Sequence, residues 1–213
     1  MKEEHTHPLE NTEMKIAEKK IVQAVREGNI EEVQTALKKG IKVNTTDEKK
    51  RSLLLIATAN KDLDMAKLLV SNGADVNQQD DIQDSPFLYA GAEGQVELLK
   101  LYLANGAKFD IFNRYRGSAL IPACERGHVE TVRLLANTKD FPIDHINRLG
   151  WTGLLEAVIL GNGSQKYVDI VEILIEAGSD PSIADADGIT PLQHAKNRNY
   201  TAIVEVLNNK HKK

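Results

Sequence analysis

The stretch Asp185-Ala186-Asp187-Gly188-Ile189-Thr190-Pro191-Leu192-Gln193-His194-Ala195 decides the fold of this chain. Asp187-Gly188 is typical of a tight turn, because glycine adopts a positive φ without steric cost. Thr190 can accept hydrogen bonds from the free N–H groups of a new helix, and Pro191 suits the first helical position. The stretch therefore predicts a turn that is followed directly by a helix start.

Weaker copies of this helix opening recur upstream at a regular spacing. The Ser or Thr that opens each copy lies at positions 52, 85, 118, 152 and 190, so successive copies are 33, 33, 34 and 38 residues apart. Three glycines that close copies, Gly40, Gly73 and Gly106, are also 33 residues apart. Each copy holds two apolar segments at helical spacing with a short break between them, which predicts a pair of helices. The chain is therefore predicted to be a repeat protein.

Several short motifs carry a resemblance to a known family. They are Gly73-Ala74-Asp75-Val76-Asn77, Gly106-Ala107, Gly127-His128-Val129 and Asp187-Gly188-Ile189-Thr190-Pro191-Leu192. Together with the period of 33, they make the chain resemble ankyrin-repeat proteins over about residues 14–209. The run 150–161 is similar to a form found in some bacterial members. The resemblance implies an all-α solenoid of about six stacked helix–turn–helix units, whose β-hairpin or turn fingers and inner helices line a concave face.

The repeat register predicts the domain organisation. We expect a single ankyrin-repeat domain over residues 14–209, with units at about 14–46, 47–79, 80–112, 113–146, 147–184 and 185–209. The first helical pattern begins near Met14, so residues 1–13 are predicted to be a polar, disordered tail, and residues 210–213 a second polar tail. The fourth unit lacks the closing glycine and has Pro122 in its helix opening, so we expect it to be a weak point of the stack.

The composition limits the classes of function. The 213 residues are 41% hydrophobic and 27% charged, with a net charge of −4, so no basic surplus supports nucleic-acid binding. No apolar run is long enough for a membrane helix, so we expect neither a nucleic-acid nor a membrane partner. With Met1 as the native start, the sequence predicts a cytoplasmic protein, although an exported chain whose leader had been removed would look the same.

No group of residues in the sequence predicts catalysis, so we expect no enzyme, no cofactor and no metal site. Cys124 is the single cysteine, and it lies where only a small side chain fits between stacked helices. His128 falls in the break between two helices, where the family commonly has a histidine, so the resemblance implies a structural hydrogen bond as its role. Four other histidines lack further ligands at metal spacing: His5, His7, His145 and His194.

The family resemblance implies that partners contact the finger tips and the inner-helix positions that face the concave surface. On the matching positions of this sequence, the expected partner-binding residues are Asp81, Ile82, Asp84, Tyr89, Arg114, Tyr115, Arg116, Arg126, Leu149, Trp151 and Glu156. The third finger is acidic and the fourth is basic and aromatic, and Trp, Tyr and Arg are enriched at binding hot spots. The same residues could equally form an ordinary solvated surface on which opposite charges pair.

We therefore expect a monomeric, non-enzymatic scaffold that binds an unknown protein partner through its concave face and fingers. The alternative is a structural or regulatory subunit that acts through its convex surface or by self-association. The predicted outer helices are polar, which counts against this alternative: Lys38, Lys39, Lys67, Glu97, Lys100, Glu172 and Glu176.

Overall fold

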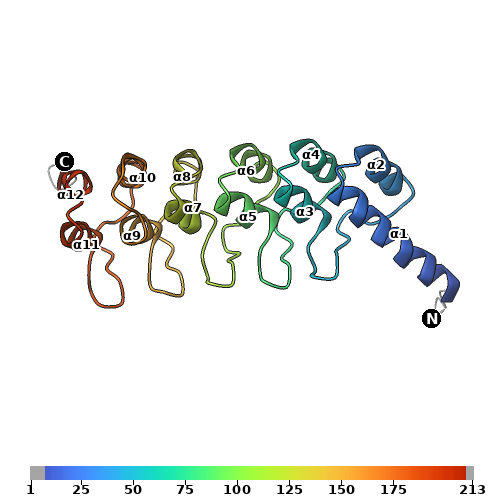
Figure 1. Cartoon of the computed structure of the whole chain (residues 1–213), viewed down its shortest axis with the longest axis horizontal. Coiled ribbons are helices and arrows are strands. Elements are labelled where there is room, and N and C mark those ends of the chain that lie inside the picture. The colour runs from blue at the N-terminus through green and yellow to red at the C-terminus, as the bar shows by residue number, and fades with distance from the viewer. Residues whose placement is uncertain (1–7, 210–213) are drawn as a thin grey trace. The chain divides into compact units, whose positions relative to one another are not determined.

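The computed structural model describes residues 8–209, and over these residues the protein is all-α. The only pairing of strand type in this range is one antiparallel bridge between Thr46 and Ser52. The helices, labelled in Figure 1, are α1 (Pro8–Arg26), α2 (Ile30–Lys38), α3 (Leu53–Ala59), α4 (Leu63–Ser71), α5 (Pro86–Ala92), α6 (Val96–Leu103), α7 (Leu120–Arg126), α8 (Val129–Ala136), α9 (Gly153–Ile159), α10 (Gln165–Glu176), α11 (Pro191–Asn197) and α12 (Thr201–Asn209). The predicted fold class and number of helix pairs are confirmed. The predicted tail at 210–213 and the pair His5 and His7 lie outside the described residues.

The chain divides into two compact units, residues 1–86 and 87–213, and each is described by itself. In the first unit, α1 packs against α3 and α2 against α4. In the second unit, the first helices α7, α9 and α11 pack in succession, as do the second helices α8, α10 and α12. Figure 1 shows these two rows. Contacts between neighbours alone are what a repeat architecture requires. A single domain over residues 14–209 stays a prediction.

Side-chain oxygens open several of the first helices, as the repeated motif predicts. The hydroxyls of Ser52 and Thr152 accept the N–H group three residues later, at 3.0 and 3.3 Å. At α11 the cap is reciprocal, because Thr190 Oγ1 accepts the N–H of Gln193 and Gln193 Oε1 accepts the N–H of Thr190 at 2.8 Å. Gly188 has a φ of +76° in the preceding turn. The turn and helix start predicted from this stretch are confirmed.

The fourth repeat departs from this pattern at its helix start. The Ser118 hydroxyl is buried without a hydrogen-bond partner, and α7 begins after Ala119 without a side-chain cap. Pro122 lies in the first turn of α7, where the missing N–H costs little. At the other end of the repeat, Asn137 Nδ2 donates to the carbonyl one turn earlier at 2.8 Å, and Asp140 takes the left-handed conformation at φ +60°. The absent cap supports the expectation of a weak repeat, which stays a prediction.

The first helix begins earlier than the sequence pattern predicts. We expected residues 1–13 to be a disordered tail, whereas α1 already begins at Pro8 and continues to Arg26. A proline at the first helical position is compatible with this start, because its N–H would have no partner within the helix. Residues 9–13 include Glu10 and Glu13, which are good helix formers. Polarity alone therefore did not distinguish a helical extension from a loose tail.

Candidate protein-binding site

The loop before each first helix from α3 onward is a five-residue turn, which we call a finger and number by its repeat. The fingers are residues 47–51, 80–84, 113–117, 147–151 and 185–189, numbered 2 to 6. In every finger, the Oδ1 atom of the first residue accepts the N–H groups of the third and fifth residues at 2.9–3.1 Å. The first residues are Asp47, Asp80, Asn113, Asn147 and Asp185. This side-chain turn makes each finger an ordered loop.

The fourth residue of every finger has a positive φ. These residues are Lys50, Gln83, Arg116, Gly150 and Gly188, with φ between +57° and +80°. From the residues themselves the sequence predicted this turn only at Gly188, whereas the other fingers were implied by the family resemblance. The usable signal was an Asp or Asn five residues before each helix-opening Ser or Thr, and it was missed.

The third residue of each finger points into solvent, since its N–H but not its side chain is held by the turn. In fingers 3, 4 and 5 this residue is a large apolar one: Ile82, Tyr115 and Leu149 are 52%, 56% and 57% exposed. In fingers 2 and 6 the same position holds the charged residues Lys49 and Asp187. Exposed apolar side chains therefore occupy one defined finger position in three consecutive repeats.

The acidic finger of the first unit uses much of its charge within the molecule. Asp80 holds its own finger, and Asp81 forms an ion pair with Lys50 of finger 2, with Nζ and Oδ1 2.8 Å apart. The N–H of Asp81 also donates to the Lys49 carbonyl at 3.1 Å. Asp84 is half-buried. Of the predicted residues on this finger, Ile82 is the one whose side chain is both exposed and apolar.

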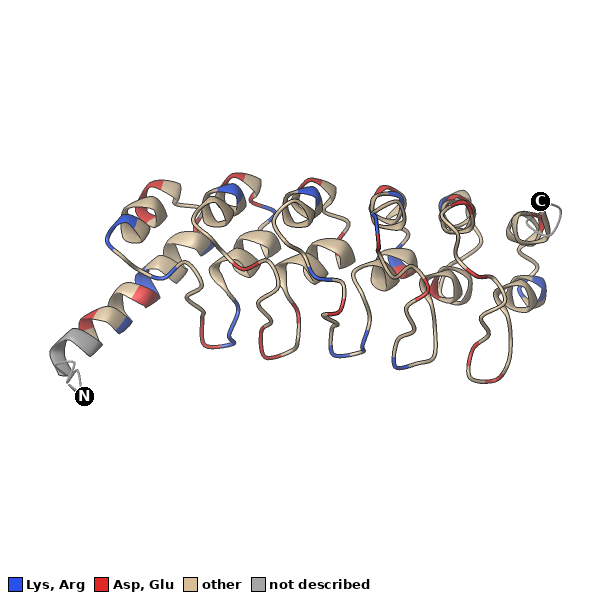
Figure 2. Cartoon of the chain, turned by 180° about the vertical axis from the view of Figure 1, so that it is seen from behind, with Lys and Arg blue, Asp and Glu red and all other residues tan. Residues whose placement is uncertain are grey.

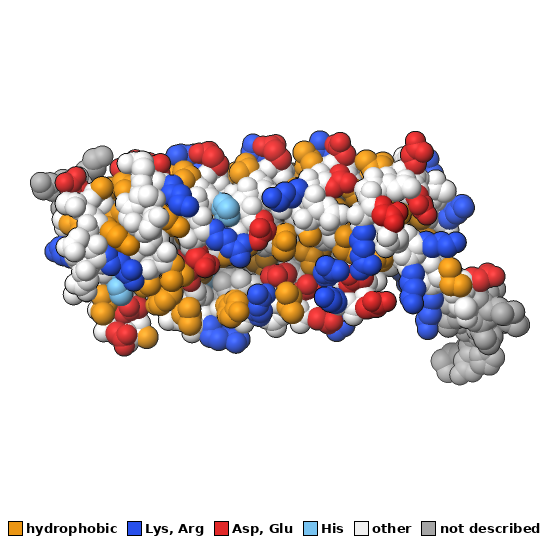
Figure 3. Space-filling model, viewed as in Figure 1, with side chains coloured by type: hydrophobic (Ala, Val, Ile, Leu, Met, Phe, Trp, Pro, Cys, Tyr) orange, Lys and Arg blue, Asp and Glu red, His pale blue; other side chains and the backbone are white. Residues whose placement is uncertain are grey.

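Fingers 4 and 5, both in the second unit, are joined at their tips. The N–H of Arg148 donates to the carbonyl of Tyr115 at 2.8 Å, and the Arg114 guanidinium lies 4.9 Å from the centroid of the Tyr115 ring. Arg116 and Arg148 are exposed. The ribbon in Figure 2 is blue at these two tips and red at the tip of finger 6. Figure 3 shows apolar and basic side chains next to one another along this edge of the second unit.

His145 connects the same two fingers, a role that was not predicted from the sequence. Its Nε2 atom lies 2.6 Å from the Arg116 carbonyl oxygen, and its ring stacks on Phe112 with the ring centroids 4.0 Å apart. The Nε2 atom of His194 lies 2.6 Å from Asp185 Oδ2 at the base of finger 6. Both histidines therefore support fingers. His128 directly precedes α8 and is half-buried, and its structural hydrogen bond stays a prediction.

The remaining predicted residues differ in how accessible they are. Trp151 and Tyr89 are half-buried, and the Trp151 N–H donates to Asn147 Oδ1 at 3.1 Å. Arg126 donates to the Ala92 carbonyl at 2.9 Å and forms an ion pair with Glu93. Trp151 therefore offers part of its ring at the base of finger 5, while the guanidinium of Arg126 already has partners.

The prediction that Glu156 contacts a partner is wrong, because its side chain is only 4% exposed. Its Oε1 atom accepts a hydrogen bond from Asn147 Nδ2 at 2.7 Å. Burial, and to a smaller extent the nearby negative charge of Glu125, raises the pKa of Glu156 to about 7. Glu156 therefore supports the residue that holds finger 5. The sequence pattern placed Glu156 on the inner helix that follows finger 5. It could not show that the rest of the protein covers this side chain.

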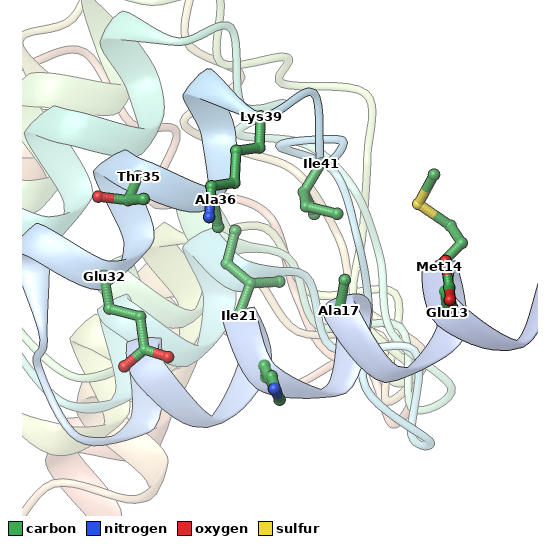
Figure 4. Close-up of a pocket in the computed structure, with 10 residues that line it drawn as sticks. Glu13, Met14, Ala17, Ile21, Glu32, Thr35, Ala36, Lys39 and Ile41 are labelled. Atoms are coloured by element: carbon green, nitrogen blue, oxygen red, sulfur yellow. The ribbon is translucent and has the colours of Figure 1, made fainter. Parts of the chain in front are cut away.

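A groove of about 830 Å³ lies between α1 and α2 in the first unit. Its floor is apolar, and Ile21 of α1 and Ala36 of α2 point into it (Figure 4). Its rim is made of both carboxylates and ammonium groups, namely Glu13, Lys20, Glu32 and Lys39. The mixed charge favours no single class of ligand, so the groove is a weaker candidate than the fingers.

Metal binding, cysteine chemistry and membrane insertion find little support in the described part of the chain. Within residues 8–209, no group of three or more His, Cys, Asp or Glu side chains could hold a metal ion. The Cys124 thiol is fully buried, and this burial raises its pKa far above the ordinary range. The predicted core role of Cys124 is confirmed. None of the helices described here is long and apolar enough to span a membrane.

Paired helices joined by ordered fingers define a helical repeat protein of the solenoid class. Residues 10–80 and 87–185 match the family model of ankyrin repeats (3 copies), so the chain belongs to the ankyrin-repeat family. The family resemblance seen in the sequence is thereby confirmed. Ankyrin repeats in general are protein–protein interaction modules rather than enzymes.

The similar proteins include solved structures and a curated bacterial relative. An ankyrin repeat domain from Acinetobacter baumannii AYE is 46% identical with a TM-score of 0.87, and the match covers 90% of this chain and 97% of that one. The ankyrin repeat protein EF0377 is 40% identical with a TM-score of 0.85, over 88% of this chain and 96% of that one. The ankyrin repeat protein YahD of Escherichia coli (strain K12) is 40% identical over 74 residues. That match spans 35% of this chain and 36% of YahD.

Proposed function

We propose that this chain binds a protein partner through the tips of fingers 4 and 5, with Tyr115 and Leu149 as anchors. The observation that carries this proposal is the third finger position, where apolar side chains more than half exposed replace the charged residues of fingers 2 and 6. Arg114, Arg116 and the exposed part of Trp151 belong to the same proposed surface. Ile82 occupies the equivalent position in the first unit, and we propose it as a partner contact of that unit by itself.

The ordered fingers favour binding on energetic grounds. The turns at Asn113 and Asn147, together with the hydrogen bond between the two tips, restrain the backbone before any partner arrives. A preorganised loop loses little conformational entropy on binding, so more of the contact energy appears as affinity. Tyrosine and arginine are also the residue types most often found at hot spots.

The alternative function, through the convex surface, finds less support. The second helices α4, α6 and α8 each carry an ion pair between residues three apart, at N–O distances of 3.7, 2.7 and 3.6 Å. These pairs are Lys67–Asp64, Lys100–Glu97 and Arg133–Glu130. Solvated pairs of this kind contribute about 0–1 kcal/mol and are typical of a face that stays in water.

Site-specific photocrosslinking tests the proposed surface. A photoreactive amino acid placed at Tyr115 or Leu149 in native cells is expected to give a discrete protein adduct that mass spectrometry identifies. The same amino acid at Asp187, the equivalent position of finger 6, and at Arg133 on α8 serves as the control. Equal or stronger adducts from Arg133 would favour the convex surface and contradict the proposal.

The dissociation constant of the purified partner then measures how much Tyr115 and Leu149 contribute to affinity. Replacing Tyr115 and Leu149 together by alanine is expected to weaken binding by tenfold or more, since each side chain is an exposed anchor that folding does not need. Asp187→Ala is the matched control and is expected to change the dissociation constant less than twofold. An unchanged dissociation constant for the double variant, with an intact helical circular dichroism spectrum, rejects these anchors.

A further inference from the structure

We infer that fingers 4 and 5 recognise an acidic polypeptide segment that also carries a large apolar side chain. This inference rests on the proposed function and specifies the chemistry of the partner. Three features of the second unit support it: basic side chains gather on fingers 4 and 5, two of them have no ion-pair partner among the described residues, and exposed apolar side chains lie beside them.

Basic charge is concentrated at the two joined tips, although the whole chain has a net charge of −4. Finger 4 has Arg114 and Arg116, and finger 5 has Arg148, whereas finger 6 has the exposed Asp187 at its third position. Figure 2 shows this change of sign between neighbouring fingers. An acidic segment is attracted to fingers 4 and 5 and repelled by finger 6, which sets one limit of the binding surface.

Two of these arginines have guanidinium groups available for a partner. Among residues 8–209, no carboxylate forms an ion pair with Arg116 or Arg148, and both side chains are exposed. Their backbones are nonetheless held, because the Arg148 N–H donates to the Tyr115 carbonyl and His145 Nε2 contacts the Arg116 carbonyl. Arginine presents a planar fork that matches a carboxylate in two hydrogen bonds. The fingers therefore combine a restrained backbone with free carboxylate-binding groups.

Apolar surface accompanies this charge. Tyr115 lies under the Arg114 guanidinium at 4.9 Å and is tied to finger 5 through its carbonyl, while Leu149 is exposed on the next tip. An ordinary charged surface does not need two exposed anchors at one turn position. A partner that supplies carboxylates alone leaves these anchors in water, so the segment is expected to carry a bulky aliphatic or aromatic residue as well.

A single-stranded nucleic acid is the other anionic ligand, and the site suits it less. Such ligands are bound along grooves lined by many basic groups and successive aromatic platforms. Here the basic tips hold three arginines and one tyrosine, and the adjoining finger 6 is acidic. An acidic segment of a protein fits this short, bounded surface better.

A display library of random 16-residue peptides, selected on the full chain, tests the inference. Peptides enriched on the wild type but not on the Tyr115→Ala/Leu149→Ala variant are expected to be acidic and to contain a large apolar residue. A synthetic copy of an enriched peptide is expected to lose tenfold or more affinity for Arg116→Glu/Arg148→Glu. The control Lys139→Glu/Lys196→Glu makes the same charge change at two exposed positions outside fingers 4 and 5 and should alter affinity less than twofold.

A further variant separates binding from folding. Arg116 has a φ of +57°, which glycine adopts more easily, so Arg116→Gly removes the guanidinium without straining the finger. It is expected to weaken peptide binding while leaving the unfolding midpoint equal or higher.

The results that overturn the inference are distinct from those that overturn the proposed function. Neutral or basic peptides that still depend on Tyr115 and Leu149 contradict the acidic partner and leave the binding surface standing. A labelled 20-nucleotide single strand that binds better than any peptide, and loses binding in Arg116→Glu/Arg148→Glu, also overturns it. No enrichment over the Tyr115→Ala/Leu149→Ala variant rejects both.

Discussion

The buried carboxyl group of Glu156 makes the stability of the second unit depend on pH, and Glu156→Gln is expected to remove that dependence. The side chain lies on α9, accepts a hydrogen bond from Asn147 at 2.7 Å, and is 4% exposed. Its Oε1 acceptor is retained in glutamine, so the variant keeps the bond to Asn147 and loses only the ionisable group. The negative charge of Glu125 on α7 also acts on it and has the same sign as the ionised carboxylate.

The size of this pH-dependent change in stability follows from the difference in the pKa of Glu156 between the folded and the unfolded chain. Burial first, and then repulsion by Glu125, raises the pKa of Glu156 from 4.5 to about 7. Between these pH values the folded protein keeps a proton that the unfolded chain releases. Stability therefore falls as pH rises through this window, by about 1.4 kcal/mol per pH unit and about 3 kcal/mol in total. Above about pH 7 both states are ionised, and the loss stays constant.

Urea denaturation of wild type and Glu156→Gln at pH values from 4.5 to 8 measures this effect. Trp151, the single tryptophan, adjoins Asn147 and reports unfolding locally, while far-ultraviolet circular dichroism reports on the whole chain. The two proteins are expected to be equally stable within about 1 kcal/mol at pH 4.5. At pH 8 the variant should be more stable by about 3 kcal/mol.

Comparing the two proteins removes the contributions of other carboxylates, which both share. Glu125→Gln is the second comparison, because removing the exposed neighbouring charge should shift the pH-dependent window slightly toward lower pH without abolishing it. A difference between wild type and Glu156→Gln that does not change from pH 4.5 to 8 would refute the reasoning, since it would show that the carboxyl titrates equally in both states.

Four further outcomes are expected. Asn113→Ala removes two turn hydrogen bonds of 2.9 Å and should lower the free energy of unfolding by about 1–2 kcal/mol in urea titrations. Gly91→Ala would place its Cβ 2.6 Å from the Cβ of Ala119, and thermal unfolding should show a loss of about 1–3 kcal/mol. Cys124 should resist iodoacetamide at pH 8 in the folded protein and react after unfolding, as read by mass spectrometry. Hydrogen exchange should be faster in α7, which lacks a cap, than in α9; equal rates would contradict a weak fourth repeat.

The sequence predicted the helix pairs because their signals are local. Thr190 and Pro191 act on the helix that they begin, and the apolar spacing needs no knowledge of distant residues. The same reasoning failed where a local rule had an exception. Pro8 is followed by polar residues that extend α1, and Ser118 occupies the opening position of its repeat without capping α7.

The candidate site was less predictable, because accessibility depends on contacts between repeats. The family resemblance implied partner contacts for both Glu156 and Leu149, yet one is buried against Asn147 and the other is exposed. Likewise Asp81 is acidic in the sequence, but Lys50 neutralises it from a residue 31 positions away. The ion pair with Lys50 confirms that opposite charges on neighbouring fingers pair within the first unit.

The structure supplies a rule that the repeat period alone does not contain. In each finger the first residue binds the backbone, the fourth has the left-handed conformation, and the third is left to face solvent. A change at the first or fourth position therefore alters stability, whereas a change at the third alters the surface offered to a partner. Read along the chain, the third positions are Lys49, Ile82, Tyr115, Leu149 and Asp187, with charge at both ends and apolar residues between. This order is the strongest reason for assigning recognition to the middle fingers, because no requirement of the turn explains it.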